Sequence, residues 1–387
     1  MFSKQLFESE HVRLTALEPD VDAPVIAGWH ADRDFVHRLT RGPARPLAPL
    51  QVRAQLTREA QESREKQRRF DFAIRLKTDE RLIGLVGLRD VLWNHGEARL
   101  SIAVGAQADR GLGYGAAALD LILRYAFSEL NLYRVWLELG ADNPEAVRFF
   151  ERHGFVVEVR RRRALLHAGQ RFDALRLSLL REEWLGQPVP EPADLGPAAA
   201  AVPLPTQPRV RLVAFDTEAA AEAERRWWSD SEFGHFQDYD IWRPRSRQQS
   251  EDEVKEMLAV DPGSFPFHLR LAVDDRLIGF LGLWVDWPNR EAWLGVGIGE
   301  RDCWGQGYGT EAVQIAIAFA FDELGLDRVS LDVLAANPRG LRAYQKAGFV
   351  IEGRIRRRNH YGGTRIDDIC MGIVKSSGRQ RVDYPAT

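Results

Sequence analysis

The chain has 387 residues and a formal net charge of −3, with 28% charged and 45% hydrophobic residues. This length and composition predict two or three globular domains, each large enough to bury a core. Acidic and basic residues are interspersed, so the overall charge gives no reason to expect nucleic acid or an anionic membrane as a partner.

The cysteines and the apolar segments indicate the compartment. Cys303 and Cys370 are the two cysteines, and no spacing resembles a disulfide framework or a metal site. Residues 1–14 lack the apolar core of a signal peptide, and no stretch approaches about 18 uninterrupted apolar residues. We therefore expect a cytoplasmic protein that neither inserts into a membrane nor binds a metal.

The first half reads as an ordered series of strands and helices. A strand at 12–17 leads into a helical segment near Trp29, and two strands with glycine-rich turns follow at 70–91. An apolar strand at 98–104 runs into a glycine-rich loop, and apolar periodicity over 116–130 then predicts a helix packed on the sheet. A β-rich run at 133–139, a short helix and two closing strands complete the series.

The second half repeats this order. Arg110-Gly-Leu-Gly-Tyr-Gly115 recurs as Trp304-Gly-Gln-Gly-Tyr-Gly309, an offset of 194 residues (304 − 110). The Asn-Pro pair at 143 and the Gly-Phe pair at 154 recur at the same offset. Such constancy indicates duplication of a whole domain. We predict domains at 1–186 and 209–376, a semi-extended Pro/Ala-rich linker at 187–208 and a tail at 377–387.

The glycine-rich loop has the composition of an anion site. In Gly305-Gln306-Gly307-Tyr308-Gly309-Thr310 alternate residues lack a β-carbon, so the backbone can take positive φ and approach a ligand closely. Amides at a helix N-terminus suit a pyrophosphate. The loop has neither the P-loop nor the dinucleotide-binding spacing. A simple tight turn and a free-nucleotide site are the alternatives, and the second copy of the loop favours a ligand site.

The Asn-Pro segment predicts a short helix with a polar face. Asn337 is a favoured N-cap, Pro338 suits the first turn and Gly348 can end the helix. Asn337 and Tyr344 are two helical turns apart, so they share one face, and the Tyr344 hydroxyl could protonate a departing thiolate. A satisfied core tyrosine is the alternative. The first half carries Phe150 at the equivalent position, without the hydroxyl.

Both halves resemble the GNAT family of N-acetyltransferases, and the second half especially resembles its ribosomal-protein-alanine acetyltransferase branch. The resemblance implies an α/β (α+β) fold: two tandem GNAT domains, each a mixed, mostly antiparallel twisted sheet flanked by helices, with a splayed strand pair. It also implies acetyl-CoA as co-substrate and no metal. The loop residues that would hold the pyrophosphate are Trp304, Gly305, Gln306, Gly307, Tyr308, Gly309 and Thr310 in the second half, and Arg110, Gly111, Gly113, Tyr114 and Gly115 in the first. Trp304 departs from the Gln/Arg of the general family pattern.

The same resemblance implies the remaining roles. Asn337 contacts the pantetheine arm, as Asn143 could in the first half, and Tyr344 is the general acid. Backbone amides near Gly297 and Ile298 polarise the carbonyl. Two further residues are candidates for the base.

Glu291 is the first base candidate, because it begins the strand before the loop; Glu97 is its equivalent in the first half. A merely solvated charge is the alternative, and Asp286 is a weaker candidate. The arginine runs at 160–163 and 354–358 are expected to form ion pairs, rather than to grip an acidic ligand. The tryptophans of the second half are expected mainly in the core or at a domain interface.

The function expected is acetyl transfer from acetyl-CoA to a primary amine, with catalysis mainly in the second half. The acceptor could be a protein N-terminus or a small amine such as a polyamine, and the oligomeric state is open. A non-catalytic acyl-CoA-binding or sensing tandem module is the alternative function. A third possibility is that both halves acetylate.

Overall fold

The computed structural model describes residues 6–32, 35–36, 45–167, 169–192, 194–237, 246, 248–249, 251–252, 263–361 and 363–375. The chain divides into two compact units. The N-unit comprises Met1–Leu139, Glu145–Val157 and Arg176–Pro190; the C-unit comprises Gly140–Pro144, Glu158–Leu175 and Glu191–Thr387. Residues 158–175, which belong to the first sequence repeat, therefore group with the second unit.

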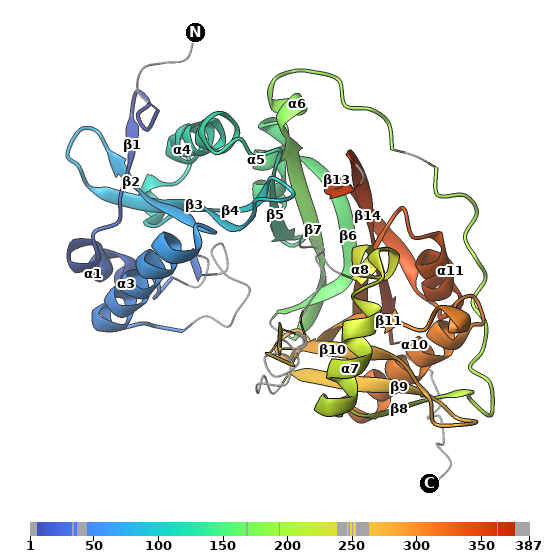
Figure 1. The fold of residues 1–387 in the computed structure, drawn as a ribbon. Helices are drawn as coiled ribbons and strands as arrows, with labels where there is room; N and C mark the ends of the chain where they lie inside the picture. The colour runs from blue at the N-terminus through green and yellow to red at the C-terminus, as the bar shows by residue number, and fades with distance from the viewer. Residues whose placement is uncertain are drawn as a thin grey trace. The chain divides into compact units, whose positions relative to one another are not determined.

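The N-unit is built on an antiparallel meander with a parallel strand added to it (Figure 1). Its strands are β1 (Val12–Thr15), β2 (Phe70–Leu76), β3 (Leu82–Leu92), β4 (Glu97–Val104) and β5 (Arg134–Gly140). The hairpin of β6 (Val156–His167) and β7 (Gln170–Leu180) follows in the chain, and its residues 158–175 belong to the C-unit. Its helices are α1 (Pro19–Trp29), α3 (Pro49–Lys66), α4 (Tyr114–Arg124), α5 (Pro144–Arg152) and α6 (Arg181–Trp184). The expected order of elements is confirmed.

The C-unit repeats this architecture in the strand order β8-β9-β10-β11-β12-β14-β13. The strands are β8 (Val210–Ala214), β9 (Ser264–Leu271), β10 (Leu277–Asp286), β11 (Glu291–Ile298), β12 (Arg328–Leu334), β13 (Val350–Tyr361) and β14 (Thr364–Val374). The helices are α7 (Thr217–Trp227), α8 (Ser231–Gln237), α10 (Tyr308–Ala318) and α11 (Pro338–Lys346). A π-helical turn, Phe319–Glu323, continues α10 and completes the apolar-periodic segment seen in the sequence.

A fork between two parallel strands confirms the expected splayed pair. Strand β11 pairs with β12 only over Glu291–Trp293 and Arg328–Ser330, and the rest of the two strands is unpaired between them. In the N-unit, β4 and β5 pair over Glu97–Arg99 and Arg134–Trp136 in the same way. Each unit therefore has a wedge whose two sides are strand edges.

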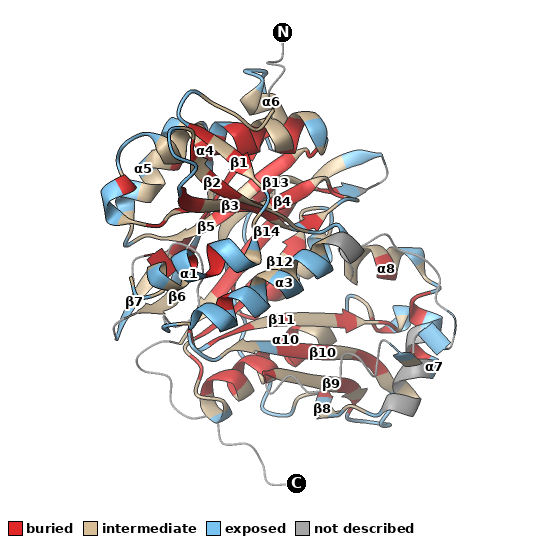
Figure 2. Ribbon diagram, turned by 90° about the vertical axis from the view of Figure 1, so that its left-hand side faces the viewer, coloured by how far each residue is buried: buried red, intermediate tan, exposed pale blue. Residues whose placement is uncertain are grey.

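The main core of the C-unit fills one face of the sheet. Because successive side chains of a strand point to opposite faces, Leu281, Leu294 and Leu331 all lie on the face covered by α10. Figure 2 shows buried residues in red along the strands, whereas helices such as α3 carry exposed residues on their outer sides. Burying each such leucine contributes about 1.5–3 kcal/mol.

Aromatic side chains occupy the other face of the C-unit sheet. Trp227 of α7 packs flat on Gly299, where an added β-carbon would lie 2.0 Å from the ring. Trp29 packs on Gly105 in the N-unit with the same spacing. Trp227 and Trp228 are buried as expected, whereas Trp284 and Trp287 are each 44% exposed. Trp242 lies outside the described residues.

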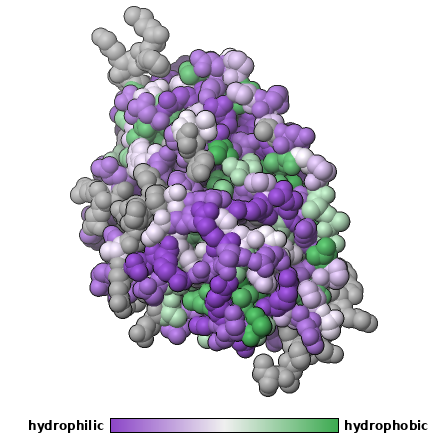
Figure 3. Space-filling model, turned by 45° about the vertical axis from the view of Figure 1, so that its right-hand side comes forward, coloured by the Kyte–Doolittle hydropathy of each residue, from purple (hydrophilic) through white to green (hydrophobic). Residues whose placement is uncertain are grey.

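The surface on the side drawn in Figure 3 is mostly hydrophilic, with small scattered hydrophobic patches. Among the helices that the structure describes, none is both long and apolar enough to cross a bilayer.

The linker segment is more ordered than its composition suggested. Residues 187–208 have no helix or strand among those described, but the chain is hydrogen-bonded within the C-unit. The Ala199 amide donates to Gln345 Oε1 (2.9 Å), the Val202 amide donates to the Lys346 carbonyl (2.8 Å), and the Val202 carbonyl accepts from Gln314 Nε2 (2.6 Å). Hydrogen bonds of its backbone therefore hold this segment against the C-unit, although it has few large side chains to pack.

Buried ion pairs close the narrow end of each fork. In the C-unit, Glu291 Oε1 accepts hydrogen bonds from Arg328 Nε (2.9 Å), Arg161 Nη2 (2.5 Å) and Ser330 Oγ (2.6 Å). In the N-unit, Glu97 and Arg134 are likewise buried, with Nε 3.6 Å from Oε2. Each pair joins the first residues of the two parallel strands, so it anchors the strands where they meet.

The arginine runs form ion pairs, as expected from the sequence. Within the C-unit, Arg162 pairs with Glu352 (2.9 Å), Arg354 with Asp367 (3.1 Å) and Arg358 with Asp368 (3.0 Å). Arg356 pairs with Glu158 (2.6 Å). These guanidinium groups are therefore engaged by carboxylates of the protein itself.

We predict that Glu291→Gln lowers the free energy of unfolding of the C-unit by about 3–5 kcal/mol, because it removes the buried negative charge that Arg161 and Arg328 share. Urea denaturation of the full chain measures the loss. Asp275→Asn, which removes one partner of an exposed pair with Arg211, should cost less than about 1 kcal/mol. Equal losses in the two variants would contradict the anchoring role.

Candidate functional site

The glycine-rich loops lie at the start of α4 and α10, as the sequence predicted. Gly305 and Gly307 have φ of +74° and +89°, and Gly111 and Gly113 have φ of +78° and +85°. A β-carbon at Gly305, Gly111 or Gly113 would meet no atom within 4 Å. The glycines are thus required by the backbone conformation, which side chains disfavour, and the space beside them is open.

Each loop presents a row of backbone amides. Among the described residues, no acceptor is found for the backbone N–H groups of residues 305–310 or of residues 111–116; the first helical bonds are donated by Glu311 and Ala117. Unpaired N–H groups at a helix N-terminus attract anions. Both loops therefore have the geometry and polarity that a pyrophosphate group needs.

Arg209 braces the loop of the C-unit, which the sequence did not reveal. Its Nη2 donates to the Gln306 carbonyl (2.9 Å), its Nε donates to Glu311 Oε1 (2.8 Å), and its guanidinium lies 4.8 Å from the Tyr308 ring centroid. This contact with Glu311 raises the pKa of Arg209 above its ordinary value, so the group remains charged. His11 is the equivalent residue of the first half, and no sequence pattern indicated that Arg209 contacts the loop.

Trp304 occupies the position of Arg110 and makes a corresponding contact. The Trp304 indole N–H donates to the Ile298 carbonyl (2.6 Å), and Arg110 Nε donates to the Val104 carbonyl (3.2 Å). Both carbonyls end the strand before the loop. The departure of Trp304 from the family pattern thus preserves the attachment of the loop to the strand. Arg339 and Arg301 stack on the indole at 4.2 and 4.8 Å.

Asn337 and Thr310 hold α11 beside the loop. Asn337 Oδ1 accepts from the Gly340 amide (2.9 Å), which confirms the predicted N-cap. Thr310 Oγ1, in the first turn of α10, donates to the Ala343 carbonyl (3.4 Å). Asn143 begins α5 at the matching place in the first repeat. These contacts fix the position of α11, and with it that of Tyr344, relative to the loop.

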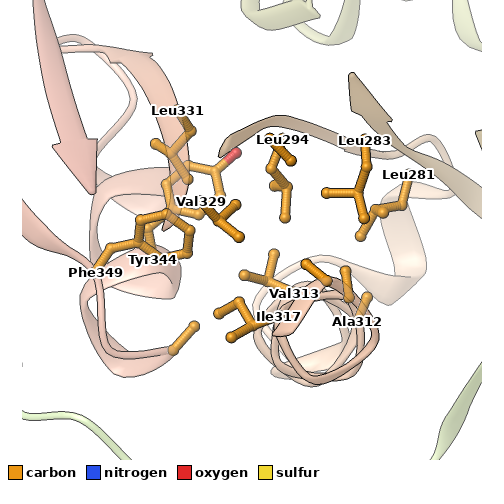
Figure 4. Close-up of a cluster of buried hydrophobic side chains, with 14 of the residues drawn as sticks. Leu281, Leu283, Leu294, Ala312, Val313, Ile317, Val329, Leu331, Tyr344 and Phe349 are labelled. Carbon is orange, nitrogen blue, oxygen red and sulfur yellow. The ribbon is translucent and has the colours of Figure 1, made fainter. Parts of the chain in front are cut away.

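Tyr344 lies at the edge of the fork. Its residue is 9% exposed and its ring packs on Phe349, with centroids 6.0 Å apart. In Figure 4 the hydroxyl oxygen points between Leu331 of β12 and Leu294 of β11, the first unpaired residues of the two strands. Its hydroxyl has no hydrogen-bond partner among the described residues, and burial raises the pKa of Tyr344 to about 12. The site therefore holds a neutral phenol.

Phe150 fills the same position in the N-unit and is buried against Phe155 and Phe149. The aromatic packing on the Gly-Phe element is kept in both units, since Phe155 is the equivalent of Phe349. The hydroxyl is therefore the difference between the two helices at this point.

The structure corrects the expectation that Glu291 is a base. Its carboxylate is 2% exposed and is engaged by two guanidinium groups and a hydroxyl, so it is a structural anion with no access to an acceptor amine. Glu97 is buried in the same way. Asp286 accepts from Asn289 Nδ2 (2.9 Å) and from its amide (3.3 Å), which makes it a turn-stabilising residue.

Gly297 and Ile298 lie on the unpaired part of β11, on the edge of the fork. Gln237 of α8 approaches them: its Oε1 would be 2.9 Å from a β-carbon at Gly297, and its Nε2 makes a long contact of 3.5 Å to the Val296 carbonyl. A glycine here allows α8 to come close to the strand. Sequence patterns gave no sign of Gln237.

Metal ligation finds no support in the part of the chain that is described, where no group of three or more His, Cys, Asp or Glu side chains is suitably placed.

Comparison with known proteins gives two matches to one domain family. The profile of the acetyltransferase (GNAT) domain matches residues 11–156 and 209–350. The spermidine N(1)-acetyltransferase of Vibrio cholerae is 31% identical over 106 residues, which cover 27% of this chain and 61% of that enzyme. The probable N-acetyltransferase YjcK of Bacillus subtilis is 29% identical over 143 residues, 36% of this chain and 78% of that protein.

Among solved structures, the crystal structure of the Vibrio cholerae spermidine N-acetyltransferase with CoA and spermine is similar, with a TM-score of 0.41 and 24% identity. The match covers 46% of this chain and 99% of that one. The two profile matches follow the two sequence repeats and together span most of the chain. The chain therefore belongs to the GNAT acetyltransferase family and carries two copies of its domain.

Proposed function

We propose that the protein is an N-acetyltransferase that moves an acetyl group from acetyl-CoA to a primary amine, with the C-unit as its catalytic unit. One observation carries the choice of unit: Tyr344 brings a protonated hydroxyl to the fork, where the N-unit has Phe150. The two relatives described above, one named for the acetylation of spermidine and the other as a probable N-acetyltransferase, support this reaction class.

The residues of the C-unit fit acetyl-CoA in three respects. The unpaired amides of 305–310 suit its pyrophosphate. The open strand edges beyond Trp293 and Ser330 can hydrogen-bond an extended pantetheine amide chain, as an added strand would. Amides of Gly297 and Ile298 on that edge are the candidates that polarise the thioester carbonyl.

In the reaction the acceptor nitrogen must lose two protons and the departing sulfur must gain one. The acceptor ammonium loses its first proton to water, and the neutral nitrogen forms a bond to the acetyl carbon. As the carbon–sulfur bond breaks, the nitrogen loses its second proton to water, which leaves the neutral amide, and the thiolate takes up a proton from water. The sulfur leaves with the electron pair of that bond, and we assign Tyr344 as the group that donates to it. Because its pKa of about 12 exceeds that of an ordinary thiol, about 8.5, the hydroxyl acts mainly by hydrogen-bonding the leaving sulfur.

We predict that Tyr344→Phe lowers kcat by about 100-fold, the lower end of the range for proton-donating groups. The affinity for acetyl-CoA should stay within about twofold, because Phe150 shows that the packing accepts phenylalanine. A raised pKa keeps the hydroxyl protonated, so any alkaline loss of activity that Tyr344 causes should begin only near pH 11–12. Steady-state kinetics with a thiol-release assay tests both points.

The reciprocal variant Phe150→Tyr is the control, since it adds a hydroxyl in the N-unit and should leave kcat unchanged. Unchanged turnover in Tyr344→Phe would refute the donor role.

We also predict that Gly307→Val weakens acetyl-CoA binding to the C-unit at least about tenfold, because a β-branched residue is strained at φ +89° and blocks approach to the amides. Calorimetric titration of the full chain measures the number of sites and their affinities. Gly113→Val makes the matched change in the N-unit and should leave turnover intact. If Gly113→Val alone abolished turnover, the catalytic unit would be misassigned.

A further inference from the structure

Asp332 is an acidic residue on the fork to which neither the core packing nor the proposed reaction assigns a role. Asp332 lies on β12, two residues beyond Ser330, the last residue paired with β11. Ser330 contacts Glu291 on the sheet face opposite α10, and alternation along the strand places Asp332 on that same face. It is thus the first residue of β12 on this face beyond the paired part of the fork.

The carboxylate of Asp332 is only partly satisfied. Its side chain is 10% exposed, its Oδ2 lies 3.4 Å from Arg358 Nη1, and its Oδ1 is buried without a hydrogen-bond partner among the described residues. Arg358 pairs more closely with Asp368, at 3.0 Å. Two carboxylates therefore contact the Arg358 guanidinium, and the contact to Asp332 is the longer of the two. A buried anionic oxygen without a donor is unfavourable, so a cationic donor would be stabilised there.

An aromatic surface lies across the fork from Asp332. Gly295 is the matching first unpaired residue of β11 on this face, since its neighbour Trp293 pairs with Ser330. Trp284 of β10 covers it: a β-carbon at Gly282 or Gly295 would lie 2.8 or 3.1 Å from the Trp284 ring. The indole therefore lies on two glycines, yet the residue is 44% exposed. Exposed indole faces attract ammonium groups and methylene chains.

The N-unit lacks this aromatic surface. Its equivalent of the Trp284–Trp293 pair is Arg89 opposite Arg99, and Ser101 replaces Gly295. Arg89 is paired with Asp71 (3.0 Å) and Arg99 with Asp90 (2.6 Å). Two ion-paired guanidinium groups therefore stand where the C-unit has its two indoles, although Glu138 keeps an acid at the place of Asp332. The cation-binding combination is therefore specific to the C-unit.

We infer that Asp332 and Trp284 form the acceptor subsite of the C-unit, and that it takes a primary ammonium joined to an unbranched apolar chain. This inference rests on the proposed acetyl transfer by the same unit. Asp332 holds the ammonium beside the fork by charge, and the Trp284 indole covers the adjoining methylene groups. Arg161 lies 4.8 Å from the Trp293 centroid and pairs with Glu291, which it shares with Arg328.

The test compares acceptor and acetyl-CoA kinetics in the full chain, with n-butylamine, spermidine and glycinamide as acceptors. We expect Asp332→Asn to raise the KM of the best acceptor about tenfold, the effect of losing one charged hydrogen bond, with the KM of acetyl-CoA unchanged. Trp284→Arg, which copies the N-unit, should raise the acceptor KM at least as much. Trp287→Ala, at a tryptophan of equal exposure, should leave it unchanged.

The outcomes distinguish failure of the proposed subsite from failure of the proposed function. If the wild type is active and both variants keep the wild-type acceptor KM, the subsite is wrong and the proposed function stands. If acetyl-CoA binds and glycinamide is preferred to both chain amines, the acceptor class is wrong. If acetyl-CoA does not bind and no amine is acetylated, the proposed function itself fails. A loss of acetyl-CoA affinity or a lower melting temperature in Asp332→Asn would assign that residue to structure, and Trp284→Arg would then decide the subsite alone.

Discussion

The buried pairing of Glu291 with Arg328 is the interaction on which the candidate site of the C-unit depends. Parallel strands gain their stability from continuous hydrogen bonding, yet β11 and β12 must separate after three residues to leave strand edges for a ligand. A buried charge pair joins the two strands at their first residues, before they separate. The same pair, Glu97 with Arg134, recurs in the N-unit.

This constraint explains why the two units differ in chemistry but not in fold. The contacts that attach the loop to the strand before it occur in both repeats, in some cases with a different side chain. For example, the carbonyl at the end of that strand accepts a hydrogen bond from Trp304 in one unit and from Arg110 in the other. The two units differ at residues beside the wedge: Tyr344 stands against Phe150, and Trp284 against Arg89. Together these differences give the C-unit a buried hydroxyl and an aromatic surface on opposite sides of its sheet.

The sequence predicted those features that depend on local patterns. The repeat, the order of the elements, the loop at a helix N-terminus and the cap at Asn337 follow from glycine spacing, periodicity and capping preferences, all of which act within a few residues. Glu291 was predicted wrongly as a base, since its position at a strand start gave no sign of Arg161, 130 residues earlier, or of Arg328. Arg209, Gln237 and Asp332 were missed for the same reason: their partners are distant in sequence.

In a duplicated chain, the role of a carboxylate depends on its surroundings in the fold and not only on its position in the repeat. A carboxylate can receive a ligand only where the fold leaves it an accessible or unsatisfied oxygen, and repeat comparison cannot detect this: Glu97 and Glu291 are both retained and both buried. Asp332, in contrast, shares its arginine with Asp368 and keeps an oxygen without a donor beside the open edge of β12. Within the C-unit, hydrogen-bond satisfaction therefore distinguishes Glu291, which anchors the fork, from Asp332, which we propose as the group that receives an ammonium.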